Sequence, residues 1–498
     1  MAGRIHLVSY VQQNLINGPK IPSRLEVRHF PRRSAGEAVN WLLDGKIPWR
    51  PNPIPVGISL DQDHSQQITK ITFSASARAV AISVDESSLK ELKVISNDGP
   101  FVKLLKGNGR FVCKDAVAGE EGSSQNTFVV VGFDFARIAV LVRKYVGVEV
   151  HGFDLGTLIA PNAKAPWPPG RMVTARVDQN ANSFSISKCW DIRVDMDAVF
   201  LRAWISECVA ERCQPELLNS TVVETARLNR KELECLENMV AENFWLEQLR
   251  PKEVVNEFAS VKTRKDGRLE VVNDRYKTKI RRSETQAIVL TTASGQEHTT
   301  RARGVKGKST TLGKLNVKEP VSSIRIIGRQ DATNSERLAD FLLLGVLQGK
   351  KTFQNSPFIR LFWFPGWKKF RPPEDTAILR PEKVEMVLRA ARLNESQERV
   401  ARMAGEKERC MIVHGPPGTG KTTTIAAIAR IWDLHDCPVW IIAHSNVAVK
   451  NIALALHKRE VGFRILVSKE FFEEWHEHLY DSIRDKTHPF RRAARVPG

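Results

Sequence analysis

Two features that are common in secreted and membrane proteins are missing from this sequence of 498 residues. Its seven cysteines are scattered and form no C-x-x-C pair and no Cys/His array, which argues against a zinc module and indicates free thiols in a reducing compartment. No stretch approaches eighteen uncharged apolar residues, since Asp134 and Arg137 interrupt the best candidate at 128–142. The N-terminus shows no secretory signal. We therefore expect a soluble, intracellular protein, cytoplasmic or nuclear, with no membrane partner.

Acidic charge is also scarce. Lys and Arg number 75 against 56 Asp and Glu, which gives a net charge of +19 and predicts a polyanionic partner. Residues 261–329 alone hold 17 Lys and Arg against 6 Asp and Glu, and Tyr276 is their only aromatic residue. This pattern favours salt-sensitive, sequence-independent binding of phosphates without base stacking. The candidate nucleic-acid contacts here are Lys277, Lys279, Arg281 and Arg282. A solvated basic face, or a loop at 300–314, remains the alternative.

The pattern of apolar and turn-forming residues indicates a multidomain α/β protein. Residues 70–165 alternate strands (77–85, 126–133, 148–155) with helices (99–107, 134–145), which implies a partly parallel sheet. Strands are also expected at 269–276, 286–294 and 323–328, and helices at 35–43, 197–212, 225–249 and 334–347. The predicted domains are an irregular Pro-rich lead-in (1–69), an α/β unit (70–165), a helical segment (190–250), a basic β-rich unit (251–330), a connector (331–392) and a P-loop domain (393–498).

Residues 412–424 read IVHGPPGTGKTTT and match the phosphate-binding P-loop pattern. A strand at 410–413 is expected to turn into a helix, and glycines at three positions let the backbone amides face a polyphosphate. Lys421 is placed to reach the β and γ phosphates and Thr422 to ligate Mg²⁺, so these two residues are the candidates for catalysis. The candidate nucleotide-binding residues are Gln397, Gly415, Pro416, Pro417, Gly418, Thr419, Gly420, Lys421, Thr422 and Thr423. Further strands are expected at 439–443 and 464–468.

Three elements, LNESQ (393–397), GPPGTGKTTT (415–424) and AHSNVAVKNIA (443–453), together resemble those of superfamily 1 helicases, in particular the branch typified by the nonsense-mediated-decay helicase. The resemblance implies an ATP-dependent nucleic-acid helicase with a RecA-like domain, ATP and Mg²⁺ as cofactors, and single-stranded RNA or DNA as partner. It implies that Gln397 contacts adenine, that Ser445 and Asn446 contact the strand, and that a small β-barrel occupies 251–330. His444 stands where the family has proline.

Other interpretations of the same residues stay open. Asn394 and Gln397 fit a helix capping box, and Ser445 fits a helix N-cap. No acidic residue from 433 to 485 ends an apolar strand as an Asp-Glu pair, and no second lobe follows. We therefore expect an incomplete motor: a truncated product or incomplete gene model of a longer helicase. A non-hydrolysing ATP- and nucleic-acid-binding fragment is the main alternative, and a P-loop kinase or other ATPase is a third.

The α/β unit at 70–165 more weakly resembles RNase H-like 3′-5′ exonucleases, through VVVGFDFARIAVLVRKYVGVEV followed by Asp154. Such nucleases hold two metal ions with four carboxylates, of which the first two are spaced D-x-E on a strand. Here Asp85 and Glu86 are adjacent, and Ala136 stands where an acid is expected. We therefore expect a non-catalytic domain, and unrelated α/β packing is the alternative.

Overall fold

The computed structural model describes residues 15–17, 25–43, 47–48, 50–62, 68–84, 99–107, 110–112, 125–159, 166–190, 198–251, 253–274, 280–283, 286–317, 319–328, 332–352, 359, 379–405, 411–443, 445–467, 483 and 486–489. The chain divides into two compact units, unit 1 over Met1–Lys368 and unit 2 over Lys369–Gly498. Its sheets and helices confirm the multidomain α/β class. Within the described ranges, no helix combines the length and apolar character needed to span a membrane.

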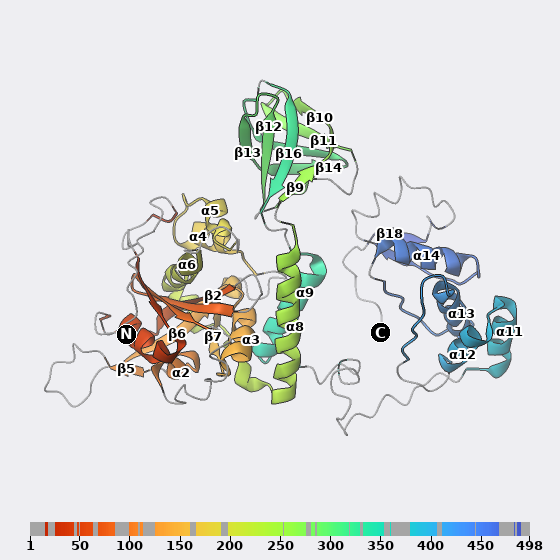
Figure 1. The fold of residues 1–498 in the computed structure, drawn as a ribbon, viewed down its shortest axis with the longest axis horizontal. Helices are drawn as coiled ribbons and strands as arrows, with labels where there is room; N and C mark the ends of the chain where they lie inside the picture. The colour runs from red at the N-terminus through yellow and green to blue at the C-terminus, as the bar shows by residue number, and fades with distance from the viewer. Residues whose placement is uncertain are drawn as a thin grey trace. The chain divides into compact units, whose positions relative to one another are not determined.

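A mixed eight-stranded sheet forms the centre of unit 1 (Figure 1). Its strands run in the order β1-β4-β3-β2-β6-β7-β8, and β5 pairs with β6. The strands are β1 (Glu26–Phe30), β2 (Ile54–Gln62), β3 (Ile68–Ala75), β4 (Arg78–Ser83), β5 (Arg110–Val112), β6 (Gln125–Gly132), β7 (His151–Asp154) and β8 (Val223–Glu224). β2, β3 and β4 are antiparallel neighbours, whereas β2, β6 and β7 run parallel. The predicted partly parallel sheet is therefore confirmed.

Helices cover both faces of this sheet. One layer contains α1 (Ala35–Leu43), α2 (Pro100–Leu105) and α3 (Phe135–Val146), and the other contains α4 (Pro169–Arg176), α5 (Ser183–Lys188) and α6 (Ala198–Arg212). In the first layer, Leu104 and Val140 share a buried core with Ile58 of β2. In the second, Trp204 of α6 packs in a core that includes Val131 of β6. Short elements complete the body: η1 (Arg32–Ser34), η4 (Leu155–Thr157), α7 (Gln214–Leu218) and η5 (Thr225–Arg227).

Helix α6 approaches the sheet most closely at Gly57 of β2. A Cβ atom at Gly57 would stand 1.8 Å from the carbonyl oxygen of Ala203. Beside this contact, the buried Arg202 donates to Ser59 Oγ at 2.8 Å and to the Leu60 carbonyl at 2.7 Å. Burial lowers the pKa of Arg202 to about 10. The absence of a side chain at Gly57 thus lets the helix backbone rest directly on the strand.

Glu207 makes a second polar contact between α6 and the sheet. Its carboxylate accepts hydrogen bonds from Ser74 Oγ at 2.7 Å and from the Ser76 amide at 2.6 Å. Burial raises the pKa of Glu207 to about 7, although these two hydrogen bonds act in the opposite direction. The polar side chains on this side of β3 are therefore satisfied by the helix that covers them.

The expectation of an irregular lead-in over 1–69 is wrong where the structure describes it. This stretch supplies β1, α1 and β2, and β2 lies at the centre of the sheet. Three of the prolines that suggested irregular structure stand at element boundaries: Pro31 immediately precedes η1, while Pro53 precedes β2 and Pro55 is its second residue. Proline is tolerated at such positions because fewer ladder hydrogen bonds are required there.

Residues Glu253–Ile327, which we call the β-unit, form two four-stranded antiparallel sheets with the orders β10-β11-β15-β14 and β13-β12-β16-β9. The strands are β9 (Glu253–Asn256), β10 (Phe258–Thr263), β11 (Arg268–Asn273), β12 (Ala287–Thr292), β13 (Glu297–Thr300), β14 (Ala302–Lys306), β15 (Ser309–Lys314) and β16 (Val321–Ile327). Leu269 and Val271 of one sheet share a buried core with Ile288, Leu290 and Ile324 of the other. The strands expected at 269–276, 286–294 and 323–328 are confirmed as β11, β12 and β16.

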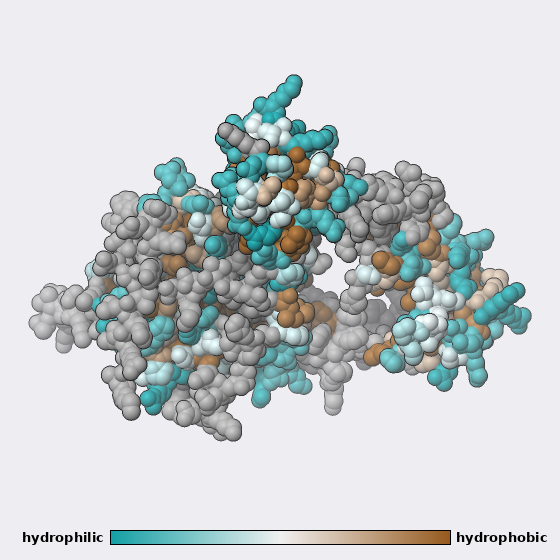
Figure 2. Space-filling model, turned by 45° about the horizontal axis from the view of Figure 1, so that its top comes forward, coloured by the Kyte–Doolittle hydropathy of each residue, from teal (hydrophilic) through white to brown (hydrophobic). Residues whose placement is uncertain are grey.

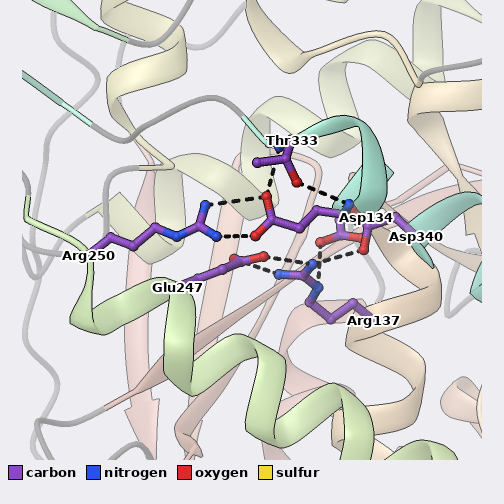
Figure 3. A network of polar contacts seen from close by, with 7 residues as sticks. Asp134, Arg137, Glu247, Arg250, Thr333 and Asp340 are labelled. Atoms are coloured by element: carbon purple, nitrogen blue, oxygen red, sulfur yellow. Dashed lines mark hydrogen bonds and ion pairs between the residues drawn. The ribbon is translucent and has the colours of Figure 1, made fainter. Parts of the chain in front are cut away.

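Two long helices flank the β-unit in the sequence, α8 (Arg230–Leu249) before it and α9 (Asn334–Leu347) after it. Both are fastened to α3 by Arg137, which bonds Glu247 of α8 and Asp340 of α9 (Figure 3). Arg250 and Glu336 form a second ion pair between the two helices. These contacts hold α8 and α9 side by side on the α/β body (Figure 1).

Unit 2 contains α11 (Pro381–Ala391), α12 (Glu395–Met403), α13 (Lys421–Asp433), α14 (Asn446–His457), β17 (Ile465–Val467) and β18 (Thr487–Pro489). The helix that begins at LNESQ and the helix that follows the P-loop are confirmed as α12 and α13. β17 lies within the strand expected at 464–468 and pairs parallel with β18.

The strands expected at 410–413 and 439–443 are wrong as far as they are described. Residues 411–416 and 437–443 are neither helix nor strand. Ile412, Trp440 and Ile442 are 85, 78 and 89% exposed, and Figure 2 shows hydrophobic surface on this unit. Apolar segments form strands only when a neighbouring strand supplies backbone hydrogen bonds. The described residues of unit 2 place no such neighbour beside them.

Candidate nucleotide-binding site

The loop at 415–420 has a conformation that only glycine accepts easily at two positions. Gly418 and Gly420 have φ angles of 82° and 78°, in the left-handed region that side chains disfavour. At Gly415 a Cβ atom would lie 2.8 Å from Thr419 Oγ1. The Thr419 hydroxyl instead donates to the Pro416 carbonyl at 2.9 Å, which closes the loop on itself. Gly418 and Gly420 are therefore favoured by their backbone conformation, and Gly415 is favoured because a side chain there would collide with Thr419.

Lys421 and the first turn of α13 face this loop. Lys421 Nζ donates to the carbonyl oxygens of Gly415 and Pro416, both at 2.7 Å. Gly420 is the N-cap of α13 and offers no side chain to the free amides of the first turn. A helix N-terminus with unpaired N–H groups favours negative charge. Lys421, Thr423 and residues 416–419 are exposed, and Thr422 is half-buried. The cradle is therefore open to a ligand from solvent.

Gln397 connects α12 to the loop. Its Oε1 accepts from the Asn394 amide at 3.1 Å, while Asn394 Oδ1 accepts from the Gln397 amide at 2.9 Å. This is the capping box that the sequence allows. Its Nε2 donates to the Thr419 carbonyl at 2.9 Å. Both the oxygen and the nitrogen of the Gln397 side-chain amide are hydrogen-bonded within the protein. This side chain therefore connects α12 to the loop at 415–420.

The hydrogen bond between Gln397 and Thr419 is a contact of the candidate site that sequence reasoning missed. The two residues are 22 positions apart, and no spacing rule connects a helix cap to a loop at that distance. The only available signal is the presence of an unsatisfied donor, since a capping box uses the Oε1 of glutamine and leaves Nε2 free.

The candidate nucleic-acid contacts are described only in part. Ser445 caps α14, because its Oγ accepts from the Ala448 amide at 3.1 Å. The side chain of Asn446 lies outside the described residues, as do Lys277 and Lys279. Arg281 and Arg282 are exposed in the segment before β12. The helix-cap interpretation of Ser445 is therefore confirmed, and a nucleic-acid role for these residues stays a prediction.

Three described acidic residues follow the loop in the sequence, Asp433, Asp436 and Glu460. Asp433 pairs with Arg430 at 2.8 Å, and Asp436 and Glu460 lie in turns with positive φ. The acids at 470, 473, 474, 477, 481 and 485 lie outside the described residues. In the parts of unit 2 that the structure describes, no carboxylate follows directly on a strand. Nor do the described residues of the whole chain contain a group of three or more His, Cys, Asp or Glu side chains suited to a metal ion.

The similarity to known proteins lies in the region that contains this loop. Residues 392–477 match the family model of an AAA domain. The domain begins just before the capping box of α12 and includes the loop, α13 and α14. The chain thus carries a P-loop domain of the kind found in nucleotide-dependent enzymes.

Curated relatives are similar to this chain only over a short stretch. The chicken (Gallus gallus) DNA replication ATP-dependent helicase/nuclease DNA2 is 36% identical over 89 residues, which is 18% of this chain and 9% of that protein. The rat (Rattus norvegicus) DNA-binding protein SMUBP-2 is 34% identical over 93 residues, 18% and 9% of the two chains. The mouse (Mus musculus) DNA2 is 43% identical over 72 residues, 14% and 7%. The chain thus spans less than a tenth of each relative, and a helicase-like P-loop domain is what these similarities support.

Proposed function

We propose that this chain belongs to an ATP-dependent superfamily 1 nucleic-acid helicase, of the branch typified by the nonsense-mediated-decay helicase. The observation that carries the proposal is the glycine-built loop at the N-terminus of α13, with Lys421 folded over it, inside a domain similar to part of two groups of helicase and DNA-binding proteins. The order LNESQ, GPPGTGKTTT and AHSNVAVKNIA adds to this support.

The residues present fit a magnesium-bound nucleotide, because the N-terminus of α13 has no side-chain cap over its amides and Lys421 lies beside the loop. A Cβ at Gly415 or Gly420 would collide with Thr419 Oγ1 or Gln397 Nε2. Lys421 Nζ would exchange two carbonyl oxygens for phosphate oxygens, and Thr422 would hold the Mg²⁺ ion. The amides of the first turn of α13 would stabilise the negative charge. Magnesium-bound ATP, when present, supplies the phosphoanhydride bond that such a motor hydrolyses.

Nucleic acid is the proposed partner. The net charge of +19 and the basic β-unit favour a polyanion, and single-stranded RNA or DNA is the substrate that the helicase resemblance implies for Ser445 and Asn446. The described cysteines Cys189, Cys208, Cys213, Cys235 and Cys437 form no disulfide, which fits action in the cytoplasm or the nucleus.

ATP hydrolysis by the 498-residue chain, with and without single-stranded RNA, tests this proposal. Turnover that RNA stimulates would support a working motor, and with or without turnover we expect Lys421→Ala to bind ATP at least about tenfold more weakly, since the mutation removes the cation beside the phosphates. Lys458→Ala is the matched control, because Lys458 is an exposed lysine at the end of α14. Equal ATP affinity for Lys421→Ala and Lys458→Ala would contradict the assignment of the loop.

A second candidate is a module that binds ATP and nucleic acid without hydrolysis. It is favoured by the unpaired state of residues 411–416 and 437–443, which precede α13 and α14 without forming the sheet that normally holds a P-loop rigid. Preorganised geometry contributes much of the rate of phosphoryl transfer. ATP binding that depends on Lys421, with no turnover above the Lys421→Ala background, would establish this candidate over the first.

Gln397 offers a separate test of how the loop is supported. We expect Gln397→Glu to keep α12 intact, because glutamate at the third helical position also completes a capping box. The same change removes the donor to the Thr419 carbonyl and places a carboxylate beside it. ATP affinity should therefore fall several-fold while thermal stability stays unchanged, as calorimetric titration and melting would show. Unchanged affinity for both ATP and GTP would leave Gln397 with a capping role alone.

We also propose that the α/β unit at 70–165 has no nuclease activity of its own. Asp154 is buried, and its carboxylate accepts from the Phe135 amide at 3.0 Å and from Thr157 Oγ1 at 3.0 Å. Burial raises the pKa of Asp154. Ala136 is buried on α3, and Asp85 and Glu86 lie outside the described residues. A carboxylate that caps a helix and a turn is not placed to hold a metal ion.

A further inference from the structure

The two sheets of the β-unit differ in charge. Exposed basic residues belong to the four strands β10-β11-β15-β14 and the turn that joins the first two: Lys262, Arg264, Lys265, Arg268, Arg303, Lys306 and Lys314. Acidic residues on the same strands and turn are two, Asp266 and Glu270. The excess of positive charge on this sheet is therefore five, within a surface only four strands wide.

The strand register places several of these side chains on one outer face. Lys262 pairs with Glu270, Glu270 with Thr311, and Arg268 with Lys314. Side chains of directly paired residues point to the same face of a sheet. Leu269, Val271 and Leu312 alternate with them and point into the core. Arg264 crosses the same outer face, because its guanidinium donates to Thr311 Oγ1 at 3.3 Å. Arg264 also pairs with Glu270 at 3.8 Å and Arg268 with Asp266 at 3.7 Å, so each of these arginines has one acidic partner.

The opposite sheet, β13-β12-β16-β9, presents a different outer surface. Its central basic residue, Arg325, pairs with Glu253 of β9 and Glu297 of β13. Val255, next to Glu253, is 67% exposed. An arginine held between two glutamates has no net attraction for an anion. The positive charge of the β-unit is thus polarised onto the β10-β11-β15-β14 sheet.

Apart from Glu270, the side chains between the basic residues are uncharged. Ser260, Thr311, Ser309 and Gly304 occupy register positions on the strands of this sheet. Phe258 is the only aromatic residue among the described strands β10, β11, β14 and β15, and it packs against the core. The face therefore provides hydrogen-bond donors and positive charge but no platform on which a base could stack.

We propose that the outer face of β10-β11-β15-β14, with Lys262, Arg268, Lys306 and Lys314, binds the phosphate backbone of duplex nucleic acid without base specificity. This site rests on the proposed nucleic-acid partner but not on ATP hydrolysis. The preference for a duplex follows from charge. A duplex carries twice the axial charge density of one of its strands, and its release of counterions per contact is larger. A single strand normally compensates through stacking on aromatic residues, which this face does not offer.

Fluorescence anisotropy with the full 498-residue chain tests the site. The probes are a 20-base-pair RNA duplex and one of its strands, titrated between 50 and 200 mM salt. We expect the wild type to bind the duplex at least about tenfold more tightly than the strand. The combined change Lys262→Gln, Arg268→Gln, Lys306→Gln and Lys314→Gln should reduce the slope of log Kd against log salt by about 3.6, since each of the four phosphate contacts contributes about 0.9.

A single-charge comparison provides the control. Arg268→Gln should weaken duplex binding several-fold, whereas Arg325→Gln, the same change on the other sheet, should leave it unaltered. Circular dichroism melting of each variant shows whether the fold is retained. Equal effects of the two variants, an unchanged salt slope, or tighter binding of the single strand would overturn the proposal.

The duplex-binding experiment and the ATP hydrolysis experiment test two different proposals. Lys421→Ala should bind the duplex as the wild type does. If duplex binding follows the prediction while the chain hydrolyses no ATP, the site stands and the motor function falls. If RNA stimulates turnover while the quadruple variant binds duplex normally, the motor stands and this site falls.

Discussion

Replacing Arg137 by methionine should lower the free energy of unfolding of unit 1 by about 3–5 kcal/mol, the cost of removing one partner from a buried ionic cluster. Arg137 holds three carboxylates at once: Asp134 at 3.1 Å, Glu247 at 2.8 Å and Asp340 at 3.0 Å (Figure 3). Its side chain is 9% exposed and that of Glu247 is 14% exposed. Without the guanidinium, the three carboxylates would repel one another, and that of Glu247 would do so from a largely buried position.

The carboxylates also hold Arg137 in its charged form. They raise its pKa, although burial acts in the opposite direction. Methionine retains much of the apolar stem of arginine but offers no hydrogen-bond donor. The loss of stability should therefore appear mainly where α3, α8 and α9 meet. Hydrogen exchange should therefore increase in Arg230–Leu249 and Asn334–Leu347, while β2 and β6 keep their protection.

The matched control is Arg402→Met in unit 2. Arg402 also contacts two carboxylates, Glu385 and Glu398, but its side chain is 40% exposed. Ion pairs in contact with water contribute little to stability, so this change should shift the urea midpoint only slightly. A shift for Arg137→Met as small as that for Arg402→Met would show that the cluster on α3 does not hold the two helices.

Helices with clear start signals are where the sequence predicts the structure best. α9 begins after Thr333 with Glu336 three residues on, and α12 begins after Asn394 with Gln397 at the same spacing. Both capping boxes form as the spacing predicts. The P-loop is equally local, because its glycines act on their own dihedral angles. Local signals of this kind need no knowledge of the rest of the chain.

Features that depend on distant partners could not be predicted in this way. The apolar run at 439–443 is typical of a strand, but strand formation needs a hydrogen-bonded neighbour, and Trp440 is exposed. Arg137 meets Glu247 and Asp340 across more than a hundred residues of sequence. No periodicity in the chain links these positions. The proline content of residues 1–69 led to the wrong prediction of an irregular segment, because prolines mark the ends of helices and strands as readily as irregular structure.

Gly57 is another position whose role depends on a distant partner and could not be predicted from the local sequence. In the sequence it is one glycine in a β-prone stretch, IPVGISLDQ, and nothing near it indicates a helix. In the structure it is the point at which α6 rests on β2, 146 residues further along the chain at Ala203. A glycine inside a central strand usually marks the close approach of another backbone.

Gly57→Ala should therefore destabilise unit 1 by about 3 kcal/mol, the upper end for overpacking a buried site. The new Cβ would lie 1.8 Å from the Ala203 carbonyl oxygen, 2.8 Å from its carbonyl carbon and 2.9 Å from the Glu207 amide nitrogen. All three are backbone atoms, so no side-chain rotation relieves the contact, and α6 must move away from the sheet. That movement would lengthen the Arg202–Ser59 and Glu207–Ser74 hydrogen bonds, now 2.8 and 2.7 Å.

Gly36→Ala is the control, and it should have the opposite sign. Gly36 is the second residue of α1, and a Cβ there would meet Pro100 Cδ at 3.5 Å, an ordinary contact. Alanine is the better helix former by about 0.5–1 kcal/mol, so this variant should melt at the wild-type temperature or slightly above. Urea and thermal denaturation of the two variants compare the same chemical change at two sites. If Gly57→Ala were as stable as Gly36→Ala, the backbone contact between α6 and β2 could not be as close as the structure places it.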